Sequence, residues 1–457
     1  MKRPQTPPYH DQPLTALTAM NHAQLLHLFQ ADIGPCDAKG RYLHWDKLRH
    51  LPSPSGFNAE LHWIATKLVR EKIARSIPLL NKDNQPFRFC IPDTLMRDLL
   101  WISENASGAM AADAIMQDKS TREHYLINSL IEEAISSSQL EGASTTRRVA
   151  KEMLTSARTP LNQSERMIVN NYKAMQFIRE YRHEPLTPSI IFELHRLLTA
   201  GTLESVDEHL ARQFRRVEDD ICVFSQDDQL LHVPPKAAEL PQRLQALCDF
   251  ANQTGDDSGE IFIPPVIKAI IVHFMISYDH PFVDGNGRTA RALFYWMMAK
   301  ENYWLLQYTS ISRVIKKAPA QYQKAYLYTE TDANDLTYFI DYQLDVIKES
   351  IHDLHKWLKD KMQELRETED VLSGSALQEQ LNHRQLSILK HALKNPGYEY
   401  SIKGHQHSHG VVYQTARTDL LNLAETFQLL KRYKIGKKDT FIVPHNLKDI
   451  IREKARQ

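Results

Sequence analysis

The twelve residues from 280 to 291 read His-Pro-Phe-Val-Asp-Gly-Asn-Gly-Arg-Thr-Ala-Arg and concentrate groups that could do chemistry. The segment holds an imidazole, a carboxylate, two glycines around an amide, and two guanidinium groups. Glycine leaves backbone N–H groups free to converge on anionic oxygens, and an imidazole that titrates near neutrality suits a general base. This inventory predicts a site that holds a nucleotide polyphosphate and its metal while a hydroxyl is deprotonated beside it.

Each group has a distinct expected part. His280 is the candidate base, and Asp284 is a hard oxygen ligand of the kind that Mg²⁺ takes together with phosphate oxygens. A helix that begins at about Asn286 would add its N-terminal N–H groups and its dipole to the anion site. Arg288 and Arg291 are three positions apart, which places both on one face of that helix, within reach of a phosphate chain.

Two other nucleotide-binding patterns are disfavoured. Residues 285–290, Gly-Asn-Gly-Arg-Thr-Ala, formally match the dinucleotide fingerprint, but that pattern needs a preceding strand and an acid about twenty residues further on. The preceding stretch instead has apolar residues at helical spacing, and residues 305–310 contain no acid. A Walker loop is excluded because the chain has no Gly-Lys-Ser or Gly-Lys-Thr triplet.

The segment resembles the signature of the Fic domain, His-Pro-Phe-x-Asp/Glu-Gly-Asn-Gly-Arg-x-x-Arg, at every specified position. The resemblance implies transfer of AMP from ATP to a Ser, Thr or Tyr hydroxyl of a protein. It implies that His280 takes the hydroxyl proton during attack on the α-phosphate and that Asp284 binds Mg²⁺. Phe282 is expected to anchor the loop in the core. The ATP-binding residues that the resemblance implies are Gly285, Asn286, Gly287, Arg288 and Arg291.

A second informative segment lies upstream. Residues 124–139 are expected to form an amphipathic helix, and Gly142 indicates its end. The apolar stripe of this helix is expected to contain Leu126, Ile127, Leu130, Ile131, Ala134 and Ile135. Glu141 would then lie at a helix C-terminus, where the dipole disfavours an acid, so its carboxylate should seek a cation.

Residues 137–142, Ser-Ser-Gln-Leu-Glu-Gly, fit the inhibitory pattern of the same family, Ser/Thr-x-x-x-Glu-Gly/Asn. The resemblance assigns the inhibitory role to Ser137, Glu141 and Gly142 and supplies Arg291 as the partner of Glu141. Such a pair would occupy the place of the γ-phosphate and hold ATP in an unproductive pose. An ordinary helix end without this role is the alternative.

The stretch from 214 to 235 interrupts the helical pattern. Two short apolar runs, 221–224 and 230–233, flank a polar turn, which predicts a β-hairpin closed by two prolines. The resemblance implies that this hairpin is a flap that pairs with the backbone of the target protein and lays the modified side chain over His280. The docking residues would be Ile221, Cys222, Val223 and Phe224. A hairpin without this role is the alternative.

Tyr322 and Tyr326 lie four positions apart, on one face of an expected helix. Their position resembles the one at which the family places a tyrosine against the adenosine of ATP. The family often shows paired tyrosines there, whereas this chain has Tyr322 followed by Gln323. Tyr322 is therefore the candidate base contact, and plain packing is the alternative.

Composition bounds the rest of the chain. A length of 457 residues predicts two or three domains, and 56 basic against 56 acidic residues give no global charge that would indicate a partner. The four cysteines, Cys36, Cys90, Cys222 and Cys248, have no paired spacing, which favours reduced thiols in a cytoplasmic protein. The sequence shows no signal peptide and no apolar stretch of about eighteen residues, so we expect no membrane contact.

We expect a mainly α fold in four parts. They are an N-terminal helical region at 1–120, a helical Fic core at 121–346, a helix and linker at 347–380, and a winged-helix-like domain at 381–457. Within the core, the inhibitory helix is expected at about 124–142 and the flap at about 214–235. The large apolar residues of the first part, such as Trp63, Ile64, Leu99, Leu100 and Trp101, are expected in the packed interior.

The last part carries fourteen Lys or Arg against six Asp or Glu in residues 381–457. Helices are expected at 383–394 and 411–427, with a short helix or turn between them, followed by a basic hairpin that turns at Gly436-Lys437. Helices followed by a hairpin resemble a winged helix, and the positive charge would suit contact with DNA phosphates, although many such modules bind only protein. The histidines at 405, 407 and 409 lack an accompanying acid or cysteine, so we expect a solvated loop there and no metal site.

The leading hypothesis is an autoinhibited protein adenylyltransferase that uses ATP and Mg²⁺ and also modifies itself. Within the enzyme class, Glu141 could instead orient a water that removes AMP from a modified protein. A hypothesis of another class is a DNA-binding or interaction protein with a vestigial Fic core, but an intact loop from His280 to Arg291 argues against it. A homodimer is a further expectation, because dimers are common in the family.

Overall fold

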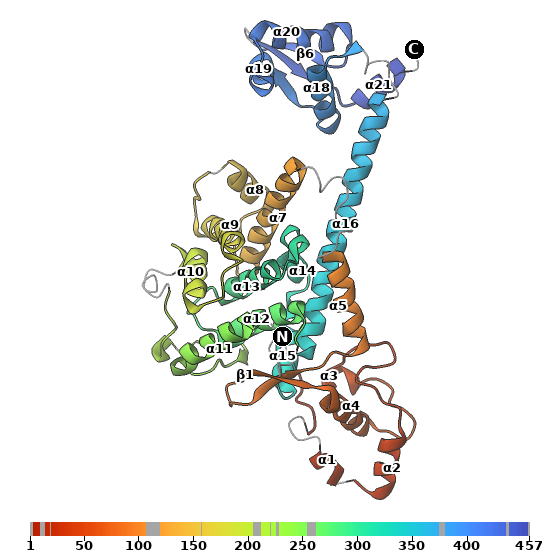
Figure 1. The fold of residues 1–457 in the computed structure, drawn as a ribbon, viewed down its shortest axis with the longest axis vertical. Helices are drawn as coiled ribbons and strands as arrows, with labels where there is room; N and C mark the ends of the chain where they lie inside the picture. The colour runs from red at the N-terminus through yellow and green to blue at the C-terminus, as the bar shows by residue number, and fades with distance from the viewer. Residues whose placement is uncertain are drawn as a thin grey trace. The chain divides into compact units, whose positions relative to one another are not determined.

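The computed structural model describes residues 3–9, 14–18, 20–106, 119–156, 158–203, 212–219, 221–224, 228–253, 262–373, 380–435 and 438–455. The chain divides into two compact units, Met1–Leu354 and His355–Gln457, and each is described by itself. Figure 1 shows that helices make up most of both units, as the sequence predicts. No helix within the described ranges is both long enough and apolar enough to cross a membrane.

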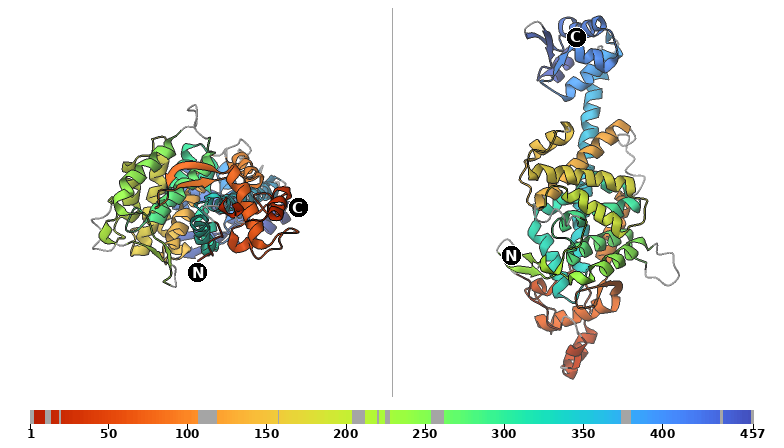
Figure 2. Two further views of the ribbon diagram at one scale, coloured as in Figure 1. Left: turned by 90° about the horizontal axis from the view of Figure 1, so that it is seen from below. Right: turned by 90° about the vertical axis from the view of Figure 1, so that its left-hand side faces the viewer.

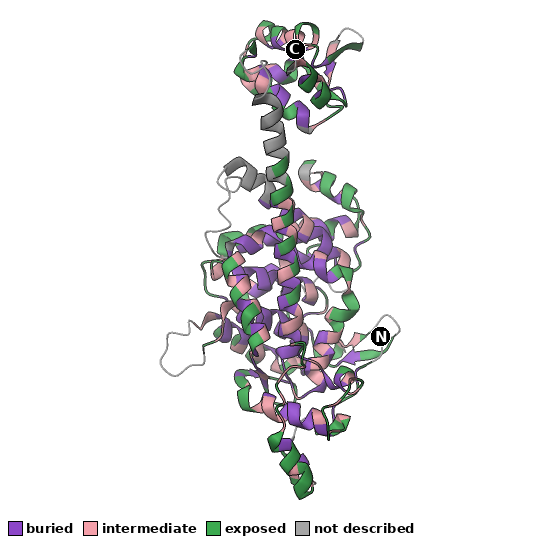
Figure 3. Ribbon diagram, turned by 90° about the vertical axis from the view of Figure 1, so that its right-hand side faces the viewer, coloured by how far each residue is buried: buried purple, intermediate pink, exposed green. Residues whose placement is uncertain are grey.

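Two buried helices form the centre of unit 1. They are α12 (Pro265–Asp279) and α13 (Asn286–Lys300), and nearly every side chain of both is buried. Helix α12 is apolar around most of its circumference and must therefore be covered on all sides, whereas the first turns of α13 also bury polar side chains. Figure 3 accordingly shows buried residues concentrated in the middle of the unit. The surrounding helices are α7 (Lys119–Leu140), α9 (Gln163–Tyr181), α10 (Pro188–Thr199), α11 (Leu240–Asn252), α14 (Ile311–Lys317), α15 (Pro319–Thr331) and the start of α16 (Thr337–Ser373).

Local sequence explains where several of these helices begin. Asn162 caps α9 by accepting a hydrogen bond from the backbone N–H of Glu165, and Thr187 caps α10 in the same way with Ile190. A side-chain oxygen at this position satisfies a backbone donor that has no partner within the helix. Pro188 follows directly at the first helical position of α10, where its missing N–H costs nothing.

The N-terminal elements pack against the core within unit 1 (Figure 2, right view, red to orange). They are α1 (Thr15–Thr18), α2 (His22–Gln30), α3 (Trp45–Leu48), α4 (Ala59–Ile73), β1 (Arg75–Leu80), β2 (Pro86–Phe89) and α5 (Asp93–Ala106). The antiparallel hairpin β1–β2 was not expected. It fixes the region to the core because Phe87 of β2 packs edge-to-face on Phe274 and Tyr278 of α12, with ring centroids 5.4 and 5.1 Å apart.

Most of the expected apolar core of this region is confirmed, with one correction. Trp63, Ile64 and Leu99 are buried and Trp101 is half-buried, but Leu100 is 58% exposed. Leu100 directly follows Leu99 on α5 and points about 100° away from it, which places it outside the buried face of this helix. Ile127 on α7 is likewise exposed, because the cluster of side chains from α8 (Arg147–Ser156) and α9 that covers this helix begins at Ile131.

Unit 2 combines helices with a small sheet. Its elements are α18 (His383–Lys394), β5 (Glu399–Ser401), α19 (Ile402–His409), α20 (Tyr413–Leu421) with a π-helical turn at Asn422–Thr426, β6 (Lys431–Ile435), β7 (Lys438–Ile442) and α21 (Leu447–Ala455). The strands are antiparallel in the order β5-β7-β6. The helix at 383–394 and the hairpin are confirmed, whereas β5 and α21 were not expected. The expected turn at 436–437 lies outside the described residues.

The short helix expected between the two longer helices is present, whereas the expectation of a solvated loop at the three histidines was wrong. Residues 402–409 form α19, in which His405 is buried and its Nε2 lies 3.1 Å from the Oδ2 of Asp419. Asp419 also accepts hydrogen bonds from Arg384 and Asn382, so this acid joins α18, α19 and α20. Ser401 caps α19 by accepting from the N–H of Gly404, a signal that the sequence contained.

Candidate active site

The loop between α12 and α13 has an unusual backbone. Helix α12 ends at Asp279, and His280 adopts the left-handed conformation with φ 46° and ψ 57°. A residue other than glycine is uncommon in this region, and such backbone strain is concentrated at functional sites. Gly285 has φ 84°, and a Cβ at that position would lie 2.7 Å from the Cγ2 of Thr199. Helix α13 begins at Asn286, as predicted.

Buried polar side chains hold this loop in shape. Asn286 accepts a hydrogen bond from the N–H of Phe282 (2.9 Å) and donates one to the carbonyl of Phe282 (2.8 Å). The Phe282 ring is buried, as expected, and stacks on His195 of α10 with centroids 3.8 Å apart. His195 Nε2 lies 2.9 Å from the carbonyl oxygen of Asp284 and must donate, since a carbonyl only accepts.

Arg215, at the start of the flap segment, braces the backbone at His280. Its Nε donates to the carbonyl of His280 (2.8 Å), and one Nη donates to the carbonyl of Pro235 at the far end of the flap. Its own backbone N–H donates to the carbonyl of Pro281 (2.9 Å). The guanidinium therefore ties the strained peptide to both ends of the flap segment.

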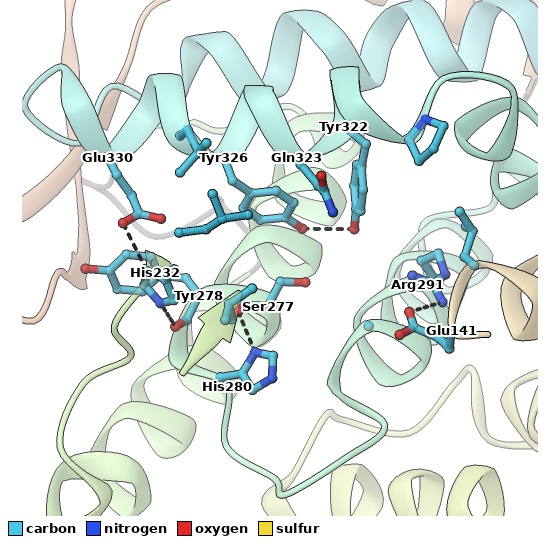
Figure 4. Close-up of a pocket in the computed structure, with 16 residues that line it drawn as sticks. Glu141, His232, Ser277, Tyr278, His280, Arg291, Tyr322, Gln323, Tyr326 and Glu330 are labelled. Carbon is cyan, nitrogen blue, oxygen red and sulfur yellow. Dashed lines mark hydrogen bonds and ion pairs between the residues drawn. The ribbon is translucent and has the colours of Figure 1, made fainter. Parts of the chain in front are cut away.

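The orientation of the His280 ring follows from one hydrogen bond. Nδ1 lies 3.2 Å from the carbonyl oxygen of Ser277, so Nδ1 carries the proton and Nε2 keeps its lone pair. Figure 4 shows this ring below Ser277. Burial lowers the pKa of His280 to about 4, against the weaker opposing effect of the Ser277 carbonyl. The expectation of a histidine that titrates near neutrality is thereby corrected, because desolvation disfavours the imidazolium.

A cavity of about 240 Å³ opens beside His280. Its walls come from the ends of α7 and α12, the start of α13, the flap and one face of α15 (Figure 4). The lining residues are Leu140, Glu141, Val223, Leu231, His232, Ser277, Tyr278, His280, Gly287, Arg291, Pro319, Tyr322, Gln323, Tyr326, Leu327 and Glu330. The structure thus brings together segments that are far apart in the sequence.

Glu141 and Arg291 meet at one end of this cavity. The Oε1 of Glu141 lies 2.8 Å from an Nη of Arg291, whose side chain is only 2% exposed. Arg291 also donates from Nε to the Oγ of Ser137 (2.9 Å) and from Nη2 to the Ser137 carbonyl (3.0 Å). Helix α7 ends at Leu140, and Gly142 follows with φ 92°, the left-handed conformation expected of a helix stop.

The Glu141 carboxylate also lies against the backbone of Gly287. A Cβ at Gly287 would clash with the Glu141 Oε1, so the carboxylate oxygen fills the space that this glycine leaves open. Gly287 belongs to the first turn of α13, where backbone N–H groups lack partners within the helix. The carboxylate therefore takes the place that an anionic group of a ligand could occupy.

Arg288 points elsewhere. Its guanidinium is 1% exposed, pairs with the Oδ2 of Asp284 (2.9 Å) and donates to the carbonyl of Leu198 (3.1 Å). Arg291 lines the cavity, whereas Arg288 is not among the lining residues, so the two arginines of the loop have different surroundings.

Asp284 has the donor chemistry that Mg²⁺ requires. Its side chain is 53% exposed, so one oxygen can exchange partners with little rearrangement. Across the described residues, no group of three or more His, Cys, Asp or Glu side chains is arranged to hold a metal by itself. A single accessible carboxylate suits a metal that arrives with a nucleotide, because phosphate oxygens and water complete its shell.

Tyr322 lines the cavity, and two hydrogen bonds hold its hydroxyl in place. The Oη lies 2.8 Å from His273 Nε2 and 3.0 Å from the Oη of Tyr326. Burial lowers the pKa of His273 to about 3, so this ring is neutral. The two tyrosines share a face of α15, as their spacing predicts.

The flap is a short antiparallel hairpin of β3 (Val223–Phe224) and β4 (Leu230–His232). Val223 lines the cavity, and Phe224 is exposed. Ile221 and Cys222 precede β3, and residues 225–227 of the expected turn lie outside the described residues. His232 holds β4 in place, since its Nε2 donates to the Tyr278 carbonyl (2.7 Å) and its Nδ1 lies 2.9 Å from Glu330.

Sequence reasoning did not find Arg215, His195, His232 or Glu330. The signal for His195 was present, because it is a polar residue within the apolar stripe that includes Ile191, Leu194 and Leu198 of α10. The others lie far from the loop in sequence, and nothing in their local pattern distinguishes them from surface residues.

Residues 185–298 match the family described as Fic/DOC, so this part of the chain contains a Fic domain. It is 32% identical over 132 residues to a protein adenylyltransferase Fic of Drosophila willistoni, which covers 28% of this chain and 23% of that protein. A protein of the same name from Nematostella vectensis is 32% identical over 114 residues, which covers 24% and 22% of the two chains. The matched region thus spans less than a quarter of either relative.

Among solved structures, a Fic family protein from Desulfovibrio desulfuricans G20 superposes with a TM-score of 0.49 and 17% identity. The superposition covers 77% of this chain and 95% of that protein.

Proposed function

We propose that this chain is an autoinhibited protein adenylyltransferase, which transfers AMP from ATP to Ser, Thr or Tyr hydroxyls of target proteins and of itself. The observation that carries the proposal is that the free Nε2 of His280 and the Glu141–Arg291 pair belong to one cavity. The names of the relatives support the same reaction. The intact loop argues against the alternative of a vestigial core.

His280 acts as the general base. Nε2 takes the proton of the target hydroxyl while its oxygen attacks the α-phosphorus, so an O–P bond forms and the bond to the β-phosphate oxygen breaks, releasing pyrophosphate. The hydrogen bond from Nδ1 to Ser277 holds the ring in the tautomer that this step needs. Arg215 keeps the His280 backbone in its strained conformation, which sets the direction of the ring.

The cavity walls provide for the nucleotide. Tyr322 and Tyr326 offer aromatic surface against which a base can stack, and the N-terminus of α13 with Gly287 offers N–H groups to phosphate. Arg291 would bind a distal phosphate once Glu141 has left it, and Arg288 would supply charge behind Asp284. A Mg²⁺ ion held by Asp284 would neutralise charge that develops on the phosphates.

Inhibition is an expected consequence of the Glu141–Arg291 pair. A carboxylate bound to this guanidinium competes with the γ-phosphate for the same donors and repels it. The triphosphate then cannot take a pose in which the α-phosphate faces the incoming hydroxyl.

The test is to incubate purified Glu141→Gly protein with labelled ATP and a lysate of its own host. Intact-mass analysis of the labelled proteins should show addition of AMP and identify the targets. The matched control is Glu141→Gly combined with His280→Ala, which lacks only the base. Labelling that persists in the double variant would contradict the proposal.

Reversal of the reaction is a second activity that Glu141 could support. Its carboxylate is partly exposed in the cavity and could orient a water for hydrolysis of AMP from a modified protein. The test uses a target already modified by the Glu141→Gly form. Loss of AMP that requires an intact Glu141 would support the hydrolase, and a stable modification would contradict it.

A second candidate function concerns unit 2, which we propose binds duplex DNA. Helices α19 and α20 are joined by a tight turn at Gly410 (φ 60°), an arrangement that resembles a helix-turn-helix. Gln414 and Thr418 are exposed on α20, with the half-buried Arg417 between them. These are side chains that can read base edges in a major groove. The exposed Lys431 and Lys434 on β6 would contact phosphates.

The DNA proposal predicts a specific salt dependence. The logarithm of the association constant for duplex DNA should fall linearly with the logarithm of the salt concentration. Lys431→Ala should make the slope shallower by about one charge, while Arg417→Ala should weaken binding and relax sequence preference. Affinity no greater than that of a neutral control protein at low salt would leave a protein-docking role.

A further inference from the structure

Helix α7 carries a polar stripe that extends well before the inhibitory pattern. Ser129, Glu133, Ser137 and Glu141 follow one another at intervals of four, so they lie along one side of the helix. The first three are buried, and all four have partners outside α7. Ser137 and Glu141 contact Arg291, whereas Ser129 and Glu133 contact the segment that runs from η5 (Trp304–Tyr308) into α14.

Glu133 is the centre of this second set of contacts. Its Oε2 accepts hydrogen bonds from Tyr295 Oη (3.0 Å), Ser310 Oγ (2.8 Å) and the backbone N–H of Ser312 (3.2 Å), and its Oε1 accepts from Ser312 Oγ. The side chain is only 2% exposed, and none of its four donors is a cation. A carboxylate buried in this way depends on all of its donors, because an unsatisfied buried charge is strongly disfavoured.

This dependence makes Glu133 a rigid reference point for α7. The Oγ of Ser129 donates to the Tyr308 carbonyl (2.6 Å) one turn earlier and reinforces the same position. Sliding or rotating α7 by one residue would pull Glu133 away from every donor at once. Glu141 lies eight residues further on, about 12 Å along the axis. Its placement on Arg291 is therefore determined by where Glu133 is held.

Helix α7 is attached to the rest of the core by a further set of contacts, which does not involve Glu133. Ile131, Ala134 and Ile135 face the other side and pack with Ala150, Met153 and Ile168 of α8 and α9. This apolar contact is non-directional and tolerates small displacements, whereas the hydrogen bonds of Glu133 do not. Loss of Glu133 should thus leave the helix bound but free to shift.

We propose that Glu133 is a positioning residue that holds the inhibitory Glu141 in register with Arg291, and so sets how completely the enzyme is inhibited. The proposal rests on the autoinhibition described above and deepens it. It also explains why the acid lies outside the cavity, since Glu133 is not among the lining residues and acts only through the helix.

The test places Glu133→Gln in the full chain, with and without Glu141→Gly, and measures self-AMPylation. In the native background, Glu133→Gln should raise the rate about fivefold or more, within the usual range of coupling between sites. In the Glu141→Gly background it should change the rate by less than about twofold, since the contact it maintains is already gone. Ser129→Ala should act in the same direction and more weakly, and provides a second variant if the glutamine protein folds poorly.

The matched control is Glu132→Gln, the same substitution at the preceding position of α7. Glu132 pairs with the exposed Arg147 and has no part in the buried network, so its loss should leave the rate unchanged. Calorimetric titration with ATP and with ADP gives a readout independent of turnover. Glu133→Gln should raise the preference for ATP over ADP, as Glu141→Gly does, because the γ-phosphate gains access to Arg291.

The outcomes separate the two levels of the proposal. A native rate and native ATP preference for both Glu133→Gln and Ser129→Ala, beside an active Glu141→Gly protein, would overturn the positioning role. An equal fall of the rate in both backgrounds would also overturn it and assign Glu133 to the support of α14. A Glu141→Gly protein that binds ATP but is no more active than the native chain would instead overturn autoinhibition itself.

Discussion

Glu141 and Arg291 are separated by 150 positions in the sequence and form an ion pair with atoms 2.8 Å apart. The pair lies between the end of one helix and the first turn of another, and Gly287 has no Cβ that would exclude it. Arg291 also donates to the hydroxyl and to the carbonyl of Ser137, so α7 and the residue that follows it supply both a hydroxyl and an acid to the same guanidinium. The inhibitory segment and the phosphate site therefore share one set of hydrogen bonds.

Replacing Glu141 with glycine should raise AMP transfer. The change removes the competitor for Arg291 and opens space above Gly287 for a terminal phosphate. A coupling of this kind commonly changes the favoured activity by about 5- to 150-fold. Self-modification of the purified chain, followed by intact mass, measures the gain. A folded variant with an unchanged or lower rate would contradict the inhibitory role.

Replacing His280 with alanine should abolish transfer while leaving ATP binding largely intact. The imidazole takes the hydroxyl proton during attack, and loss of a general base commonly lowers the rate by about 10²- to 10⁴-fold. The measurement is best made in the Glu141→Gly background, where the rate is high enough to follow over that range. Calorimetric titration with ATP is the control for binding, and transfer at the parental rate would remove His280 from the mechanism.

The pH dependence follows from the lowered pKa of His280. Burial lowers this pKa to about 4, so the free enzyme keeps Nε2 unprotonated at all higher pH values. The value of kcat/KM reports the pKa of groups in the free enzyme, and its acidic limb should therefore fall near pH 4 and not near 6.5. The Glu141→Gly protein, over the range in which it stays folded, gives this profile. Its acidic limb should not lie above that of the native chain, because the Glu141 carboxylate raises the pKa of His280. NMR titration of the imidazole, assigned with His280→Ala, checks the group directly.

Arg215 should matter for both activity and stability. Its guanidinium donates to the carbonyls of His280 and Pro235, and alanine would leave these buried acceptors without partners. The expected cost is about 1–3 kcal/mol in the free energy of unfolding. Transfer should fall by about 10²-fold, because small displacements of a catalytic group are costly.

The neighbouring Arg216 provides the control for that experiment. Its side chain is exposed and pairs with Asp219 at 3.3 Å, so Arg216→Ala should be nearly neutral in both denaturation and transfer. Equal effects of the two substitutions would show that the brace at His280 is unimportant.

Local patterns were sufficient for much of the fold. Helix α13 begins where the glycines and Asn286 indicate, and α18 has the predicted bounds because Asn382 and Gln385 form a capping box. The hairpin β1–β2 was missed, since its apolar residues gain their meaning only from packing against Phe274 and Tyr278. β-Structure depends on such tertiary context more than helices do.

Part of the candidate site could likewise be predicted from a local pattern, and part of it could not. The twelve-residue loop contains the base, the anion-binding backbone and both arginines, so its local pattern carries most of the prediction. The loop is braced by Arg215 and His195, which contact backbone carbonyls. Every residue has a backbone carbonyl, so the sequence does not indicate which one will accept such a hydrogen bond. The pKa of His280 was misjudged for a related reason, because burial is a property of the fold and not of the motif.

Removing the chain after about residue 375 should separate unit 2 from catalysis. The division between the two compact units lies at residues 354 and 355, within α16, and a cut after Ser373 leaves this helix entire. The cavity, the loop and the Glu141–Arg291 pair all belong to unit 1. The truncated Glu141→Gly protein should therefore self-modify at the rate of the full-length Glu141→Gly protein. It should also lose any retention on immobilised duplex DNA, because the cut removes the exposed Lys431 and Lys434. Circular dichroism of the truncated protein is the control for folding, and a folded but inactive product would show that unit 2 is part of the catalytic body.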